Sequence, residues 1–317
     1  MTSFSKVYFR IIMNKEKVLA IDIGGTGIKV AVVDKHGKIE PLFTEKTHFF
    51  KEIDEIPIYI QKKLKNSSDE LGLIGIGIGA PNGNSLTGCI EFAPNLPWKG
   101  KIPIVEKFEN HFSLKTKLAN DANAAALGEK LFGTEGDKTN FVFITLGTGL
   151  GSGIVIDGQL VTGHDGLAGE LGHMILIPNG RNCGCGRKGC VETYCSSTGL
   201  VTTYVEKCKD KKLTDITSEE IYFKAMKGEI EALETFNYTG YLLGLTLANC
   251  VTFSSPKTFF LFGGLTKAKE LLLNPTIKSF SENILEIYKN KIEILTSTLP
   301  DNKAAFLGAA SLIFNEI

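Results

Sequence analysis

Residues 18–33, Val-Leu-Ala-Ile-Asp-Ile-Gly-Gly-Thr-Gly-Ile-Lys-Val-Ala-Val-Val, decide the fold of this chain. The apolar runs 18–23 and 28–33 are typical of strands, and Gly24–Gly27 between them is typical of a tight turn. Turn residues 34–37 end the second run. The stretch therefore predicts a hairpin with a glycine-rich turn.

A second copy of this pattern begins near Phe141. The apolar run 141–145 leads into a glycine-rich turn at 146–153, and the run 154–156 returns. Asp157-Gly158 then signals a tight turn. Two copies of one hairpin predict two related halves.

The rest of the chain alternates helix-like and strand-like segments. Residues 102–112 and 121–131 are predicted helices, with Asn120 as a cap for the second. A third glycine turn, Gly263-Gly264, follows the apolar strand 259–262 and precedes a helix-like stretch. We place the domain boundary near Asn120 and Asp121, where the first series of strands and helices ends.

Composition excludes several classes of function. A chain of 317 residues should hold two domains, and 43% hydrophobic residues is typical of a globular protein. The formal charge of zero gives no reason to expect a nucleic-acid or membrane partner. Residues 235–256 lack charges, but their Asn, Gly and Ser content favours a buried helix over a membrane span. Seven cysteines, an odd number, favour a reducing compartment, with the cytoplasm as the default.

Residues 1–17 are interpreted as a leader. Arg10 interrupts their apolar run and no small-residue cleavage site follows, so a signal peptide is not indicated. We expect Met13 to begin the functional unit, and deletion of residues 1–12 to leave activity intact.

The glycine turns predict phosphate binding. Glycine lets backbone N–H groups approach phosphate oxygens, and Thr26 and Thr148 add hydroxyl donors. Asp22 can hold a hydrated Mg²⁺, and Lys29 can neutralise a triphosphate. The alternative is an ordinary hairpin with a solvated Lys29, which the repetition of Gly-Thr-Gly disfavours.

A histidine and three cysteines predict a zinc site. His173, Cys183, Cys185 and Cys190 offer the imidazole and thiolates of a closed tetrahedral site, which is structural because no position is left for water. The alternatives are a redox pair or unremarkable buried cysteines, which clustering makes less attractive. Glu170 and Glu192 flank the ligands, and their carboxylates suit a polyhydroxyl ligand.

Asp121 is the candidate general base. Phosphoryl transfer needs positioning, charge neutralisation and a carboxylate that accepts the proton of the alcohol. Taken alone, Asp121 could equally be a helix cap, because Asp and Asn favour helix starts. The phosphate-type turns and the flanking carboxylates favour the catalytic interpretation.

These residues resemble the ROK family of repressors, open reading frames and sugar kinases, from about Lys17 to the end of the chain. The stretch 22–29 looks like its first phosphate motif, Asn120-Asp121 like its catalytic pair, and 146–149 like its second phosphate motif. Residues 169–173 and 183–192 look like its sugar and zinc segment.

The resemblance implies an α/β fold of two actin-like, ribonuclease-H-like ATPase domains with a cleft between them. These would span residues 18–120 and 121–300, with a helix at about 301–317 returning to the first. It implies general-base catalysis by Asp121 and sugar binding by a set that includes it: Asn95, Asn120, Asp121, Glu170, His173 and Glu192. It implies ATP or phosphate contacts from Asp22, Gly24, Gly25, Thr26, Lys29, Gly147, Thr148, Gly149, Gly263 and Gly264, the last two in an adenosine pocket.

One departure concerns residues 79–84, where members often have Gly-x-Pro-Gly and this chain has Gly-Ala-Pro-Asn-Gly-Asn. The resemblance therefore does not imply backbone contacts from this stretch to a sugar.

We expect an ATP-dependent hexose kinase that acts first on glucose and uses Mg²⁺ and structural zinc, with a homodimer as the assembly. N-acetylglucosamine, N-acetylmannosamine, mannose and fructose remain open as substrates. A repressor of this family is disfavoured, because about seventeen residues before the first strand are too few for a helix-turn-helix unit. A non-catalytic sugar sensor would not need Asp121 together with both phosphate turns.

Overall fold

The computed structural model describes residues 16–64, 71–133, 135–209 and 215–316. The chain divides into two compact units. Unit 1 comprises Met1–Thr134, Thr162–Ala168 and Thr298–Ile317, and unit 2 comprises Glu135–Val161 and Gly169–Ser297. This division differs from the predicted boundary near Asn120, since the helix that follows Asn120 belongs to unit 1. The expected start at Met13 lies outside the described residues.

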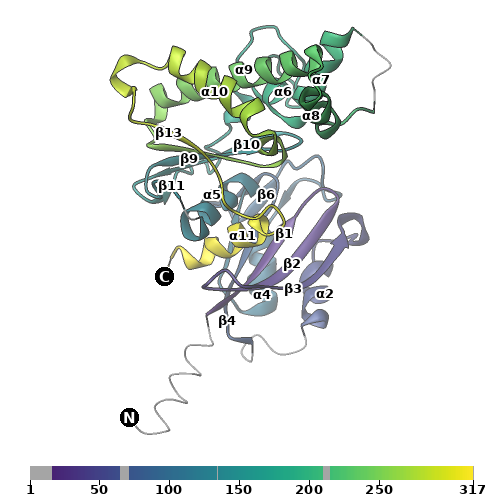
Figure 1. Cartoon of the computed structure of the whole chain (residues 1–317). Coiled ribbons are helices and arrows are strands. Elements are labelled where there is room, and N and C mark those ends of the chain that lie inside the picture. The colour runs from purple at the N-terminus through teal and green to yellow at the C-terminus, as the bar shows by residue number, and fades with distance from the viewer. Residues whose placement is uncertain (1–15, 65–70, 134, 210–214, 317) are drawn as a thin grey trace. The chain divides into compact units, whose positions relative to one another are not determined.

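Unit 1 is built on a mixed sheet with strand order β3-β2-β1-β4-β8 (Figure 1). β1 pairs antiparallel with β2, and β2 with β3, whereas β1–β4 and β4–β8 are parallel. The predicted first hairpin is confirmed as β1 and β2. The strands are β1 Lys17–Ile23, β2 Gly27–Asp34, β3 Ile39–Lys46, β4 Leu73–Gly79 and β8 Thr116–Ala119.

Helices and a small second sheet complete unit 1. The two predicted helices are confirmed as α4 and α5, and the Asn120 side chain caps α5 by accepting from the Ala122 N–H at 2.9 Å. The helices are α2 Glu55–Lys63, α4 Ile104–Phe112, α5 Asp121–Phe132 and α11 Ala304–Phe314, with the 3₁₀ helix η1 Thr47–Phe49. The small sheet contains β5 Gly83–Asn84, β6 Cys89–Glu91 and β7 Lys101–Ile102.

The C-terminal helix α11 is part of the core of unit 1. It is apolar on almost all sides, as expected of a buried helix, and it packs on α5, β1 and β4 (Figure 1). Gly308 permits this approach, because a Cβ atom there would lie 2.7 Å from the backbone of Ala124 in α5. The last helix thus closes a unit that the first strand begins.

Unit 2 repeats the sheet arrangement of unit 1. Its strand order is β11-β10-β9-β12-β13, with antiparallel pairs on the β10 side of β9 and parallel pairs on the β12 side. The two related halves predicted from the glycine hairpins are therefore confirmed, in the actin-like α/β fold. The strands are β9 Phe141–Leu146, β10 Leu150–Ile156, β11 Gln159–Leu160, β12 Thr258–Phe262 and β13 Glu293–Thr296.

The glycine-rich turn predicted at 146–153 in unit 2 was too long. β10 begins at Leu150, so residues 150–153 are strand, because each of them pairs with β9 despite their glycine content. The turn is reduced to Gly147–Gly149. The tight turn at Asp157-Gly158 is confirmed, with φ of 49° and 73°, the left-handed conformation that such hairpin turns require.

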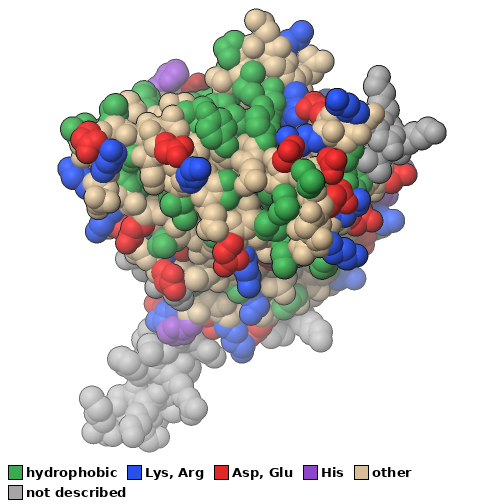
Figure 2. Space-filling model, turned by 45° about the horizontal axis from the view of Figure 1, so that its top comes forward, with side chains coloured by type: hydrophobic (Ala, Val, Ile, Leu, Met, Phe, Trp, Pro, Cys, Tyr) green, Lys and Arg blue, Asp and Glu red, His purple; other side chains and the backbone are tan. Residues whose placement is uncertain are grey.

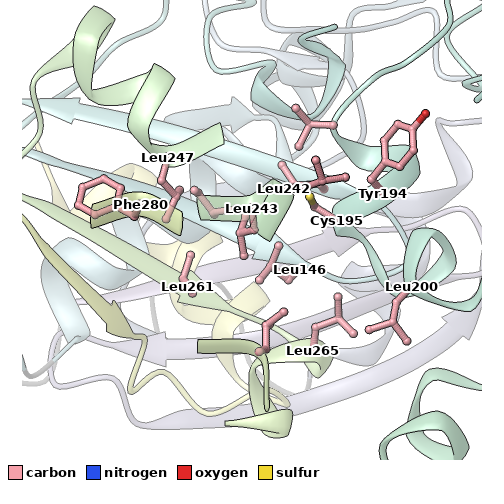
Figure 3. Close-up of a cluster of buried hydrophobic side chains, with 14 of the residues drawn as sticks. Leu146, Tyr194, Cys195, Leu200, Leu242, Leu243, Leu247, Leu261, Leu265 and Phe280 are labelled. Carbon is pink, nitrogen blue, oxygen red and sulfur yellow. The ribbon is translucent and has the colours of Figure 1, made fainter. Parts of the chain in front are cut away.

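Helices cover the sheet of unit 2 and enclose its core. Figure 3 shows apolar side chains such as Leu146, Leu243, Leu261 and Phe280 gathered in this core. The uncharged stretch 235–256 lies mostly within α9, whose many buried residues confirm the prediction of a buried helix. The helices are α6 Glu192–Cys195, α7 Ser197–Cys208, α8 Ser218–Met226, α9 Ile230–Ser254 and α10 Glu270–Asn283, with the 3₁₀ helices η2 Leu171–His173, η3 Gly264–Ala268 and η4 Glu286–Tyr288. Within the described ranges, no helix has the length and apolar character needed to cross a membrane.

Charged side chains of both signs are interspersed over the face shown in Figure 2. This agrees with the equal numbers of basic and acidic residues, 35 of each.

Candidate active site

The parallel strands of unit 1 bring the first phosphate turn and Asp121 to one edge of the sheet. Asp22 of β1 pairs with Gly79 of β4, and Gly79 pairs with Ala119 of β8. The carboxyl ends of these strands therefore lie side by side, and the glycine turn after β1 and the Asn120-Asp121 pair after β8 both leave from that edge. Ligands of open α/β sheets bind at such an edge.

Asp22 and Lys29 face each other across the first hairpin. The Lys29 Nζ lies 3.2 Å from the Asp22 Oδ2, with the Lys29 side chain half exposed and that of Asp22 mostly covered. In the turn, Gly24 donates to the Gly27 carbonyl at 2.9 Å, while Gly25 and Thr26 are exposed. A carboxylate, an ammonium group and an exposed glycine turn together can hold a cation and a polyphosphate.

Asp121 occupies the first turn of α5, next to its cap. Its Oδ1 accepts from the Ala122 N–H at 2.8 Å, the same donor that the Asn120 side chain engages. Asp121 is exposed to solvent, although many protein atoms lie around its carboxylate. This desolvation, added to the nearby charge of Asp22, raises the pKa of Asp121 above its ordinary value of 3.8. A carboxylate with a raised pKa is a better proton acceptor than an ordinary one.

Asn95 lies against the first phosphate turn. A Cβ atom on Gly25 would approach the Asn95 carbonyl oxygen to 3.1 Å and its Cβ to 3.2 Å, so a larger residue would crowd this contact. Asn82, where the chain departs from the family pattern, has φ of 51°, a left-handed conformation that Asn tolerates.

The two glycine turns of unit 2 lie next to each other. Thr145 of β9 pairs with Phe262 of β12, so Gly147 and Gly263 follow neighbouring parallel strands at one edge. Gly263 has φ of 109°, and a Cβ atom there would lie 2.7 Å from the Leu146 carbonyl oxygen, so this close approach requires glycine. The residues predicted to contact phosphate and adenosine in this unit therefore form one neighbourhood.

A cavity of about 300 Å³ opens beside Gly264. Two features distinguish it, an aromatic pair and several polar groups, and its lining includes Tyr222, Phe223, Ser218, Glu219, Lys267 and Leu265. No local pattern singles out these residues, apart from the capping box Thr217–Glu220 that starts α8. Their place beside Gly264 depends on how α8 packs in the folded unit.

The four predicted metal ligands come together in unit 2. Their donor atoms lie within 4.8 Å of one another, with the His173 Nδ1 at 3.6 Å from the Cys183 Sγ and the Cys185 and Cys190 Sγ atoms 3.6 Å apart. Sulfur atoms bound 2.3 Å from one tetrahedral ion would be about 3.8 Å apart, so the donor set fits zinc. Hydrogen bonds from Arg187 lower the pKa of Cys185 to about 6 and favour its thiolate.

The histidine and the two flanking carboxylates are arranged around this cluster. The His173 Nε2 points away from the thiols and lies 3.9 Å from the Glu170 Oε2. Glu192 instead links the cluster to the second glycine turn, because one carboxylate oxygen accepts from the Leu150 N–H at 3.0 Å and the other lies 3.7 Å from the Cys183 Sγ. The contact of Glu192 with the turn joins distant parts of the sequence, so local patterns could not predict it.

Residues 18–316 match the model of the ROK family. The chain belongs to this family. It is 31% identical over 316 residues to a glucokinase of Thermotoga maritima, with 96% of this chain and 99% of the relative covered. The fold is also similar to a crystal structure of a ROK family glucokinase from Streptomyces griseus in complex with glucose and AMPPNP. The sequences are 32% identical, the match covers 93% of this chain and 98% of the glucokinase chain, and the TM-score is 0.76. A xylose repressor of Bacillus subtilis is 32% identical over 77% of this chain and 62% of the repressor.

The predicted site residues of this ROK protein are divided between its units. Unit 1 carries the residues predicted to act as base, cation ligand, first phosphate turn and part of the sugar site, namely Asp22, Gly24, Gly25, Thr26, Lys29, Asn95, Asn120 and Asp121. Unit 2 carries the metal cluster and the remaining groups, namely Gly147, Thr148, Gly149, Glu170, His173, Cys183, Cys185, Cys190, Glu192, Gly263 and Gly264. In each unit the glycine turns leave from one edge of the sheet, and in unit 2 the histidine and the cysteines form a separate cluster.

Proposed function

We propose that this protein is a glucokinase, which transfers the γ-phosphoryl group of ATP to the 6-hydroxyl of glucose. The protein is an ATP-dependent sugar kinase, and glucose as the preferred sugar is the proposal. The observation that carries it is the strand register Asp22–Gly79–Ala119, which brings a carboxylate with a raised pKa and a phosphate-type turn to the same edge of one sheet. The glucokinases among its relatives support glucose as the substrate.

In this proposal the residues of unit 1 perform the transfer. Asp121 accepts the proton of the sugar 6-hydroxyl while the hydroxyl oxygen bonds to the γ-phosphorus of ATP. The bond between the γ-phosphorus and the oxygen that leaves with ADP breaks in the same step. Asn120 and Asn95 hold the sugar, and Asp22 holds the hydrated Mg²⁺ that neutralises the phosphates. Lys29, half exposed beside Asp22, adds positive charge to the same place.

The residues of unit 2 bind the nucleotide and the remaining sugar hydroxyls. The N–H groups and hydroxyl of Gly147–Gly149 meet the phosphates, while the cavity beside Gly264, with Tyr222 and Phe223 in its lining, suits an aromatic base. Glu170, His173 and Glu192 accept or donate hydrogen bonds to hydroxyls.

Zinc is proposed as a structural ion in this enzyme. His173 and the three cysteines would hold it through four donors, which leaves no open position for chemistry. Its contribution is to fix the loop and the tautomer of His173, so that Nε2 carries the hydrogen when Nδ1 binds the metal. A cytoplasmic location, expected from the thiolate ligands, belongs to the same proposal.

A coupled assay of ADP release across a panel of sugars tests the proposal. We expect the highest kcat/KM with glucose in a panel that also contains mannose, fructose, N-acetylglucosamine and N-acetylmannosamine. A tenfold preference for another of these sugars would replace glucose as the substrate, and no ADP release with any of them would contradict the kinase itself. Light scattering on the same preparation checks the expected homodimer.

A further inference from the structure

The segment that carries Asn95 has little regular structure to hold it. β6 ends at Glu91 and β7 begins at Lys101, and between them Asn95 is exposed. Ala93, Leu96 and Trp98 are buried and anchor three points of the segment. Phe92 and Asn95 themselves are exposed, so their backbone needs a further restraint if Asn95 is to keep its place against Gly25.

Asn82 supplies two hydrogen bonds to the start of this segment. Its backbone carbonyl accepts from the Glu91 N–H at 3.0 Å, and its side-chain Nδ2 donates to the Phe92 carbonyl at 2.7 Å. Phe92 has φ of 49° while its side chain is 85% exposed, so side-chain burial does not hold this unfavourable backbone conformation. The Asn82 amide is the group that engages its peptide.

Asn82 is in turn fixed to the strand that precedes the proposed base. Ala80 donates to the Ala119 carbonyl at 3.1 Å, and Gly83 donates to the Ala80 carbonyl at 3.0 Å. Gly83 lies so close to β8 that a Cβ atom there would be 2.6 Å from the Ala119 carbonyl oxygen. A short path of hydrogen bonds and one peptide bond thus connects Ala119, which precedes Asn120, with Phe92.

We propose that Asn82 is a positioning residue, whose side-chain amide holds the Phe92–Asn95 segment in register with Asp121 and thereby sets the affinity for sugar. This role rests on the proposed function, in which Asn95 binds sugar and Asp121 accepts its proton. It is distinct from that function because Asn82 acts through the Phe92 peptide.

The variant Asn82→Gly removes the amide but keeps the left-handed backbone, which glycine adopts readily. Asn290→Gly is the matched control, because Asn290 is also left-handed, with φ of 59°, and lies exposed in unit 2. Both changes add the same freedom to the unfolded chain. Loss of one neutral hydrogen bond predicts a rise of about 2- to 10-fold in the KM and Kd for sugar with Asn82→Gly, an unchanged KM for ATP, and no change in either with Asn290→Gly.

A second measurement tests the hydrogen bond from Asn82 to Phe92 without an activity assay. Trp98 is the single tryptophan of the chain, it is buried, and it lies three residues after Asn95. Quenching of its fluorescence by acrylamide should increase in Asn82→Gly and not in Asn290→Gly. Asn82→Asp keeps the size of the side chain but replaces the N–H donor with an oxygen, so it should lower sugar affinity and increase quenching at least as much.

The outcomes separate this role from the proposed function. Parent-like sugar Kd in both Asn82 variants would overturn the positioning role, whether or not Trp98 becomes more accessible. A rise in sugar Kd and quenching that Asn290→Gly shares would overturn it as well. A parent protein that phosphorylates no sugar would contradict the proposed function and this role with it, whereas an active parent with unchanged Asn82 variants contradicts the role of Asn82 alone.

Discussion

Asp121 illustrates how one residue can be a cap, a base or both. Because Asn120 already caps α5, replacement of the Asp121 carboxylate should cost the helix little. Its raised pKa and its place at the sheet edge are features that a cap does not need. The two interpretations therefore lead to different kinetics.

We predict that Asp121→Asn lowers kcat by about 10² to 10⁴ while sugar binding largely survives. The amide keeps the shape and much of the hydrogen bonding but cannot accept the proton. Steady-state kinetics and calorimetric sugar binding check this result. Glu192→Gln is the comparison and should act mainly on sugar affinity; an Asp121→Asn enzyme with parent-like turnover would mean that Asp121 is not the base.

The raised pKa of Asp121 also predicts how stability depends on pH. Ionised Asp121 is disfavoured in the folded state, so its cost is absent below the unfolded pKa near 3.8, grows as pH rises above that value and is complete above the raised folded pKa. Asp121→Asn removes this cost. Relative to the parent, the variant should melt at a higher temperature at pH 7.5, and this advantage should be much smaller near pH 4. Thermal melts of both proteins at the two pH values measure it; an advantage that is the same at both would be evidence against the raised pKa.

At the scale of elements, the second glycine turn and the metal loop are linked through Glu192. Gly149 and Gly147 border the same turn but have different surroundings. A Cβ atom on Gly149 would lie 2.3 Å from the Glu192 Oε2, whereas one on Gly147 would meet no atom within 4 Å.

We predict that Gly149→Ala displaces the Glu192 carboxylate from the Leu150 N–H and raises the KM for sugar. Gly147→Ala in the same turn should leave Glu192 in place, because its methyl group would meet open space, and should act on the KM for ATP if this turn binds the phosphates as proposed. Kinetics with each substrate varied in turn distinguish the two effects. If both variants change only the KM for ATP, Glu192 does not depend on this contact.

The metal loop can be tested through one exposed ligand. We predict that Cys185→Ser lowers the zinc content and weakens sugar binding, because His173 loses the ion that sets its orientation. Cys208→Ser is the control, since Cys208 lies at the end of α7, outside the cluster. Metal analysis and sugar titration check both variants. Native protein that contains no zinc, or a Cys185→Ser variant with full zinc and parent-like affinity, would contradict the zinc proposal.

These elements also show what the sequence can and cannot predict. The hairpins, the capped helix at Asp121 and the metal ligands were predictable, because each is encoded within a short stretch by strand periodicity, turn residues or ligand spacing. The cavity beside Gly264 and the contact of Glu192 with Leu150 were not, because they arise when distant segments pack together. The strand extension at Leu150 was missed because pairing with β9 overrode the local preference of glycine for turns.

At the scale of the whole molecule, unit 1 is assembled from both ends of the chain. The boundary predicted near Asn120 assigned α5 to the second domain, whereas the structure places it in unit 1. The difference arises because α5 packs against α11, almost two hundred residues later in the sequence. Two close approaches of backbone to backbone allow α11 to pack in unit 1. One is Gly308 against α5, and the other is Gly77 of β4 against Ala309 of α11.

Gly77→Ala should therefore destabilise unit 1 by forcing α11 away from the sheet. A Cβ atom on Gly77 would lie 1.8 Å from the Ala309 carbonyl oxygen, a contact between backbone and side chain that no rotamer change can relieve. Overpacking of this kind costs about 1–3 kcal/mol or more, which lowers Tm by at least a few degrees. Gly79→Ala is the matched control, because Gly79 lies on the same strand and the same face, and its nearest neighbour would be the Ala124 Cβ at 3.8 Å, an ordinary van der Waals contact. Thermal melts of the two variants should separate clearly, with only Gly77→Ala melting earlier. Equal melting temperatures would show that α11 is not packed on β4 in solution, and that the C-terminal helix is not a structural part of unit 1.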